Sequence, residues 1–116
     1  MADILALIIG LAGIVFIITG FIILKYPPRK INMIYGYRSG SSMKSQQRWD
    51  FAQKFSSKEM MRTGLFMVIL STGIYFLEIR INEIAALITS LAFIILTVSF
   101  MIIRTEKSIR KKFGKS

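Results

Sequence analysis

Length, composition and charge already limit what this chain can be. Its 116 residues suit one domain, 53% of them are hydrophobic, and the formal net charge is +10. The chain has no cysteine and no histidine, which excludes disulfides, thiol catalysis and any metal site or proton relay built on histidine. No metal or other cofactor is expected.

The first predicted element is a transmembrane helix over residues 4–24. These 21 residues carry no charge, and about 20 apolar helical residues cross the ~30 Å hydrocarbon core of a bilayer. We expect the segment to be retained rather than cleaved as a signal peptide, because no basic residue precedes it and Lys25 follows it. Small residues share one face and should let another helix approach closely. They are Ala6, Gly10, Gly13 and Gly20.

Residues 25–59 are predicted to form a cytoplasmic loop that contains an amphipathic interfacial helix. Pro27 and Pro28 should end the first helix, because proline has no backbone N–H to donate. From about residue 43 to residue 56 the pattern is helical, and the helix should lie on the membrane surface with Trp49 at headgroup depth. Its apolar face comprises Trp49, Phe51, Ala52 and Phe55. Its solvated face comprises Gln46, Asp50, Gln53 and Lys54.

Two further spans are predicted at about residues 60–78 and 84–103, followed by a basic cytoplasmic tail over residues 104–116. The second span reaches membrane length only if Arg62 extends its guanidinium to the headgroups. Helix packing explains the small and polar residues of these spans better than a substrate path does, because no ionisable side chain lies inside a span. Those residues are Gly64, Ser71, Ala86, Ser90 and Thr97. The whole chain, residues 1–116, should be one all-α transmembrane domain of three helices.

The basic residues alternate from one side of the predicted membrane to the other. Residues 25–62 hold nine Lys and Arg and the tail holds six, whereas the 78–83 turn holds one. The positive-inside rule therefore places the loop and the tail in the cytoplasm and the amino terminus outside, in a multi-pass membrane protein. Anionic lipid headgroups are the expected partner of these charges, and nucleic acid is not.

The loop also concentrates residues suited to binding. Asn32, Tyr35, Gly36, Tyr37 and Arg38 combine a planar guanidinium fork, two amphipathic rings, an amide and a flexible backbone position. They could form a polar pocket that caps the bundle, or simply an interfacial turn with its aromatic belt. The residues alone leave both interpretations open.

Arg48 falls within the apolar sector of the predicted interfacial helix. Its stem could cover apolar surface while the guanidinium reaches water. Alternatively it binds a partner, such as Glu59 or a phosphate. Asp50 and Glu59 are nine residues apart and fall on roughly perpendicular helix faces, so they do not resemble a general acid and base pair. The chain is therefore not expected to be an enzyme.

The loop resembles the signature of the SdpI family of bacterial membrane immunity proteins. The resemblance is carried by Pro28-x-x-Ile31-Asn32-x-x-Tyr35-Gly36-Tyr37-Arg38-Ser39, then Ser42-Met43-Lys44, then Trp49-x-x-Ala52. Ser39 and Ser45 stand where the family commonly has Thr and Asn. The resemblance implies a binding site on the cytoplasmic face that comprises Asn32, Tyr35, Gly36, Tyr37, Arg38, Ser42, Lys44, Arg48 and Trp49.

The resemblance further implies a location in the bacterial cytoplasmic (inner) membrane and immunity to a secreted, membrane-active toxin. A peptide toxin and a cytoplasmic repressor are the partner types that it suggests. Two alternatives come from other functional classes. One is a small-molecule or lipid transporter that works as a homo-oligomer, and the other is a membrane scaffold that sequesters a cytoplasmic regulator.

Overall fold

The chain folds into three long helices. The computed structural model describes residues 4–32, 36–79 and 81–114. Within them lie α1 (Ile4–Lys25), a short 3₁₀ turn η1 (Ser42–Lys44), α2 (Gln46–Phe76) and α3 (Glu83–Phe113). The expected all-α fold is confirmed, and α1 matches its predicted bounds within one residue.

Local chemistry sets the helix boundaries. At the start of α2 the Ser45 hydroxyl accepts a hydrogen bond from the Arg48 backbone N–H at 3.1 Å. The Asn82 side chain does the same at the start of α3, where it accepts from the Ala85 N–H at 2.8 Å. Both residues are strong N-caps because they satisfy a backbone donor that has no partner within the helix. At the end of α3, Gly114 adopts a positive φ of 87° and donates its N–H to the Arg110 carbonyl at 2.7 Å.

The prediction of a separate interfacial helix is wrong. Residues 46–56 are the first turns of α2 and continue without a break into the expected second span, so the connecting loop ends at Ser45 rather than at residue 59. Neither glycine nor proline occurs between Gln46 and Thr63, so nothing in the sequence interrupts the helix. Trp49 and Ala52 are fully buried against the rest of the protein and do not rest on a membrane surface.

Two helices among the described residues, α1 and α3, are long and apolar enough to cross a membrane. Only 22% of the most apolar stretch of α1 and 17% of that of α3 is buried inside the isolated chain, which is unlike the core helix of a soluble protein. The 31 residues of α2 extend about 46 Å at 1.5 Å per residue, which exceeds the ~30 Å hydrocarbon core. One end of α2 must therefore project beyond the apolar layer if the helix lies along the membrane normal.

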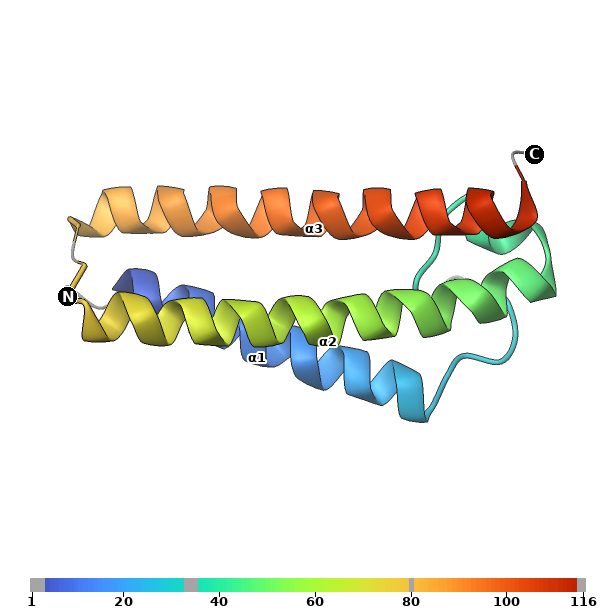
Figure 1. Cartoon of the computed structure of the whole chain (residues 1–116), viewed down its shortest axis with the longest axis horizontal. Helices are drawn as coiled ribbons and strands as arrows, with labels where there is room; N and C mark the ends of the chain where they lie inside the picture. The colour runs from blue at the N-terminus through green and yellow to red at the C-terminus, as the bar shows by residue number, and fades with distance from the viewer. Residues whose placement is uncertain (1–3, 33–35, 80, 115–116) are drawn as a thin grey trace.

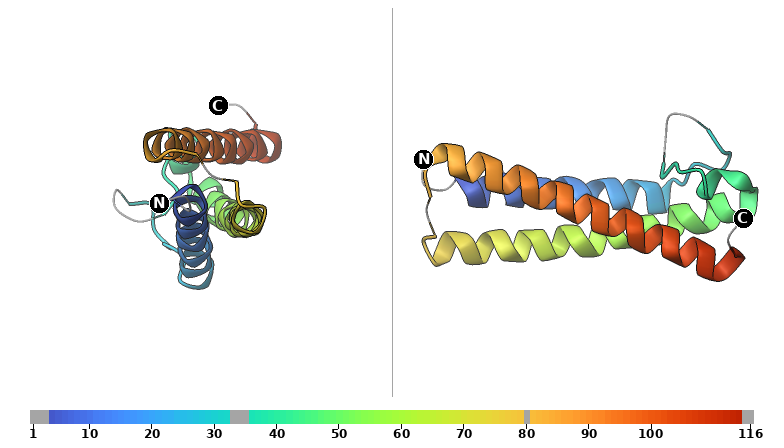
Figure 2. Two further views of the ribbon diagram at one scale, coloured as in Figure 1. Left: turned by 90° about the vertical axis from the view of Figure 1, so that its left-hand side faces the viewer. Right: turned by 90° about the horizontal axis from the view of Figure 1, so that it is seen from above.

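The helices run lengthwise in a molecule of 47 × 26 × 22 Å. The amino end of α1 and the α2–α3 connection lie at one end, while the loop and the carboxyl end of α3 lie at the other (Figure 1). Helices α1 and α3 diverge toward the loop end (Figures 1 and 2). This arrangement collects the polar and basic segments at one end of the bundle.

The predicted small-residue face of α1 packs directly on α2. A Cβ atom placed on Gly13 would lie 2.7 Å from the Gly64 carbonyl oxygen, and one placed on Gly20 would lie 2.7 Å from the Ser57 carbonyl oxygen. A Cβ atom on Gly10 would lie 2.9 Å from the Ser71 hydroxyl. Such close backbone approach requires residues without side chains, so the expectation that this stripe serves helix packing is confirmed.

We predict that Gly13→Ala lowers the stability of the bundle, because its methyl group would collide with backbone. The expected loss is about 1–3 kcal/mol, the usual cost of overpacking. Gly73→Ala is the matched control, since no atom lies within 4 Å of the position its Cβ would take. It should be neutral or stabilising, because alanine favours helix by up to ~1 kcal/mol over glycine. Thermal unfolding in detergent measures both, and equal losses would show that α1 does not pack as described.

Candidate functional site

Backbone carbonyl groups of the loop between α1 and α2 accept hydrogen bonds from side chains of α2. The Trp49 indole N–H donates to the Pro28 carbonyl at 2.5 Å, and the Gln46 amide donates to the Arg29 carbonyl at 2.5 Å. Trp49 is completely buried, so its indole N–H needs this partner. Trp49 therefore anchors the beginning of the loop.

A buried glutamine holds the middle of the loop. The Gln53 side-chain oxygen accepts from the Tyr37 backbone N–H at 2.6 Å, while its amide nitrogen donates to the Tyr37 carbonyl at 2.7 Å. Gln53 is only 2% exposed, which corrects its predicted place on a solvated helix face. Gly36 has a φ of 100°, and a Cβ atom there would lie 2.5 Å from the Gln53 side-chain oxygen. Glycine thus lets the loop backbone approach the amide closely enough for both bonds.

The tail of α3 binds the same loop through a carboxylate. Glu106 accepts hydrogen bonds from the Tyr37 hydroxyl at 2.6 Å and from the Ser39 hydroxyl at 2.7 Å. Ser39 and Ser42 exchange backbone-to-hydroxyl hydrogen bonds at 2.9 and 3.1 Å, which closes a tight turn. Ser42 is fully buried within it. Tyr37 thereby links the loop to α2 through its backbone and to α3 through its ring.

The environment of Tyr37 keeps its phenol protonated. Burial raises the pKa of the Tyr37 phenol above its usual range, and the hydrogen bond and negative charge of Glu106 raise this pKa further. The hydroxyl is therefore a donor at any physiological pH. A charge-assisted hydrogen bond of this kind is stronger than one between neutral groups.

Arg48 has a partner, but not Glu59. Its guanidinium donates to the Gly114 carbonyl at 2.9 Å and to the Ser41 hydroxyl at 3.2 Å, and it stacks at 5.6 Å from the Phe113 ring centroid. A cation at the carboxyl end of α3 is favoured by the exposed carbonyls of that helix end. Arg48 therefore ties the start of α2 to the end of α3.

Glu59 instead joins α2 to α3 through an ion pair with Arg104. Its carboxylate accepts from the Arg104 Nε at 2.7 Å and from Arg62 at 3.0 Å. Glu59 is 6% exposed, so its charge requires such partners. Together with Arg48 and Glu106, this ion pair fixes the carboxyl half of α3 against α2.

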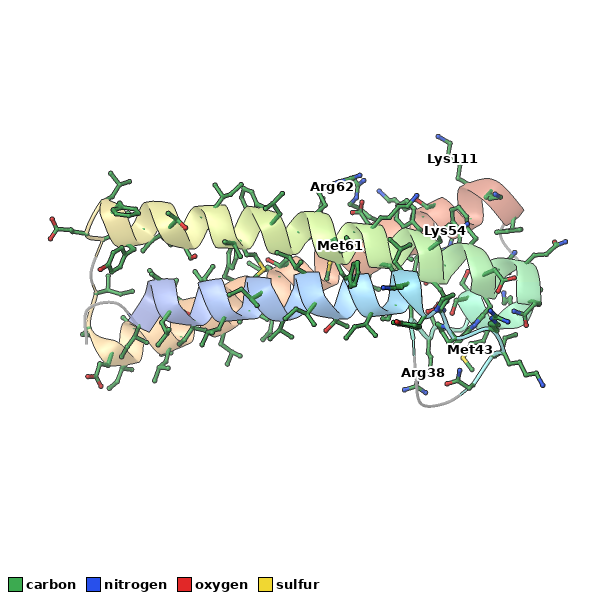
Figure 3. The ribbon with its side chains drawn as sticks, turned by 90° about the horizontal axis from the view of Figure 1, so that it is seen from below. Arg38, Met43, Lys54, Met61, Arg62 and Lys111 are labelled. Atoms are coloured by element: carbon green, nitrogen blue, oxygen red, sulfur yellow. The ribbon has the colours of Figure 1, made fainter. Side chains whose placement is uncertain are left out.

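Asn32, Arg38 and Lys44 are the remaining predicted site residues that the structure describes. Asn32 donates to the Lys30 carbonyl at 2.9 Å, a local contact on the exposed side of the loop. Arg38 is exposed and points away from the helices (Figure 3). Lys44 is exposed on η1. Tyr35 lies outside the described residues.

Lys44 and Arg48 meet at a basic cleft of about 620 Å³ near the carboxyl end of α3. Its walls comprise Gly40, Ser41, Lys44, Arg48, Glu106, Arg110 and Gly114. Among the residues that the structure describes, the cleft walls carry three cations and one carboxylate, a balance that favours an anionic group. Among the described residues no group of three or more His, Cys, Asp or Glu could hold a metal ion. The arrangement is suited to binding.

Comparison with known proteins identifies the family. Residues 29–109 match the SdpI/YfhL protein family. The chain belongs to the SdpI/YfhL family. The match begins in the loop and extends through α2 into the last turns of α3, so it covers the hydrogen bonds of Tyr37 and Ser39 to Gln53 and Glu106.

A relative in this family is an uncharacterized protein, YfhL, of Bacillus subtilis strain 168. It is 33% identical to this chain over 81 residues, which cover 66% of this chain and 74% of YfhL. No solved structure matches the chain significantly. Family membership and two membrane-length apolar helices together indicate a membrane protein.

Sequence reasoning missed two residues that organise this SdpI/YfhL-type site. Gln53 was assigned to solvent because amides usually are, and its burial depends on a backbone partner 16 residues away. Glu106 is the single acidic residue of the basic tail, and nothing in the local pattern names its partners. That isolation was the available signal, since one carboxylate among six cations at a helix end often has a specific donor.

We predict that Gln53→Ala destabilises the loop, because it leaves the Tyr37 N–H and C=O without partners in a partly buried place. The expected loss is about 1–3 kcal/mol for the unsatisfied groups. It should appear in the unfolding midpoint in detergent and as faster hydrogen exchange of the Tyr37 amide.

The control for this prediction is Gln47→Ala. Gln47 is exposed on the same helix, and among the described residues its side chain makes no hydrogen bond. Its loss should stay within about 0.5 kcal/mol. If the two variants unfold alike and the Tyr37 amide exchanges equally, the loop is not held by Gln53.

Proposed function

We propose that this SdpI/YfhL-family protein confers immunity to a secreted, membrane-active toxin, through a polar site on the cytoplasmic face of the membrane. In this proposal, residues 1–116 form one transmembrane domain of three spans. The site comprises the loop from Gly36 to Ser42 together with the basic cleft and the exposed Arg38. A peptide toxin is the proposed ligand.

One observation carries this proposal. Several of the residues that give the chain its family resemblance are held by hydrogen bonds at one end of the bundle. Tyr37 and Ser39 bind Glu106 of α3, and the Tyr37 backbone binds Gln53 of α2. Hydrogen bonds that hold one loop to two helices are typical of a binding site kept in a fixed shape.

The charge distribution supports a cytoplasmic location for the site. The loop and the carboxyl end of α3 lie at the same end of the molecule, opposite the α2–α3 connection (Figure 1). These two segments hold most of the Lys and Arg residues. The positive-inside rule then orients the amino terminus outward.

Orientation is tested with single cysteines at positions 44 and 112, and at position 78 in the opposite turn. An impermeant thiol reagent applied to intact cells should label only position 78. Labelling of position 44 or 112 from outside would contradict the proposed orientation, and permeabilised cells confirm that all three cysteines can react.

We predict that Arg38→Lys reduces protection while membrane insertion is unchanged. Lysine keeps the charge that sets topology but loses the planar fork that binds a carboxylate or phosphate at two points. A charged hydrogen bond is worth roughly 1.5–3 kcal/mol. The tolerated toxin concentration should therefore fall about tenfold, the factor that corresponds to about 1.4 kcal/mol.

Survival of toxin-exposed cells, normalised to the amount of protein in the membrane, measures this effect. Arg29→Lys makes the same chemical change at another exposed loop position, and Lys54→Ala removes an exposed charge from α2. Both controls should protect as the wild type does. If Arg38→Lys also protects fully, the guanidinium has no specific role in immunity.

A further inference from the structure

Helices α1 and α3 diverge toward the loop end of the bundle (Figures 1 and 2). Residues of both helices line a second cavity beside the loop. Its volume is about 500 Å³, within the ~300–1,000 Å³ typical of ligand sites. All three helices and the loop contribute to its walls. The lining side chains that matter below are Phe16 and Ile23 of α1, Met60 of α2, and Val98, Met101 and Ile102 of α3.

The cavity walls are mostly apolar. The Thr105 hydroxyl is buried in the wall and already donates to the Met101 carbonyl at 2.8 Å, so it offers no free donor. Phe16 and Val98 belong to the charge-free runs of α1 and α3, which places this part of the cavity at the depth of hydrocarbon. An apolar space at that depth suits an acyl chain and does not suit water.

The mouth of the cavity carries a cation. Arg38 lines it from the loop, with its side chain directed away from the helices (Figure 3). No hydrogen bond or ion pair within the described part of the chain engages its guanidinium. The nearby acid, Glu106, does not line this cavity and is bound by Tyr37 and Ser39. The mouth therefore presents an unneutralised guanidinium beside an apolar space.

We propose that this cavity binds one anionic phospholipid, with an acyl chain between α1 and α3 and the headgroup phosphate on Arg38. Guanidinium binds phosphate at two points, and the apolar walls bind the chain. The many basic residues at this end of the molecule attract anionic lipids and raise their local concentration. This site would bind a component of the membrane itself, so it does not depend on whether the protein confers immunity.

The direct test is native mass spectrometry of the full-length protein in detergent. Phosphatidylglycerol and phosphatidylcholine with identical acyl chains are offered in equal amounts. We expect one phosphatidylglycerol to be retained at least tenfold more often than phosphatidylcholine. Inorganic phosphate in excess should not displace it. Equal retention of the two lipids, or displacement by phosphate alone, would overturn the proposal.

Two matched pairs of variants locate the binding. Val98→Phe fills the cavity and should reduce retention of phosphatidylglycerol about tenfold, whereas Leu96→Phe adds the same ring to the exposed face of α3 and should have no effect. Arg38→Gln should abolish the preference for the anionic lipid. Lys58→Gln removes the same charge from an exposed position on α2 and should retain it.

Photochemical labelling of the wild type keeps the test decisive if Val98→Phe does not fold. Phosphatidylglycerol with a diazirine in its acyl chain should label Val98, Met101 and Ile102 in preference to the exposed Leu96. Even labelling around α3 would mean that the chain contacts only the general lipid surface, and would overturn the proposed site.

Discussion

The arrangement of this protein's loop end depends on one buried amide. Gln53 accepts a hydrogen bond from the Tyr37 N–H and donates one to the Tyr37 carbonyl. One side chain of α2 thus satisfies both backbone groups of Tyr37, as a neighbouring strand would do in a β-sheet. Because Gln53 is nearly inaccessible to water, both Tyr37 groups would be costly to leave unpaired once the loop packs there. The amide therefore selects one position for the loop on α2, and that position brings the Tyr37 ring to α3.

The second half of the linkage is electrostatic. The Tyr37 hydroxyl and the Ser39 hydroxyl converge on Glu106, while Glu59 binds Arg104, two residues earlier on α3. These contacts close the bundle at an end where α1 and α3 diverge and share little apolar surface. The apolar cavity lies between the diverging helices. The loop forms part of its wall and contributes the exposed Arg38. The proposed lipid site would therefore depend on the way the loop is anchored.

Sequence patterns predicted the parts of this fold that depend on local chemistry. The charge-free runs gave α1 and the apolar part of α3, and the glycine spacing gave the face through which α1 packs on α2. Residues 46–56 were expected to lie on a membrane surface, because a helical wheel shows which residues are apolar but not what covers them. The roles of Gln53 and Glu106 could not be predicted for the same reason, because their hydrogen-bond partners come from distant segments of the chain. The resemblance in the loop indicated where a site would form, but not that a buried amide shapes it.

A double-mutant cycle tests the contact between the loop and α3 most directly. Unfolding free energies in one detergent are compared for the wild type, Tyr37→Phe, Glu106→Gln and the double variant. Direct contact predicts a coupling energy of about 0.5–3 kcal/mol. A parallel cycle with Tyr75→Phe, an exposed tyrosine near the opposite end of α2, should give none. Additive losses for Tyr37 and Glu106 would contradict the claim that this loop is bound to both helices.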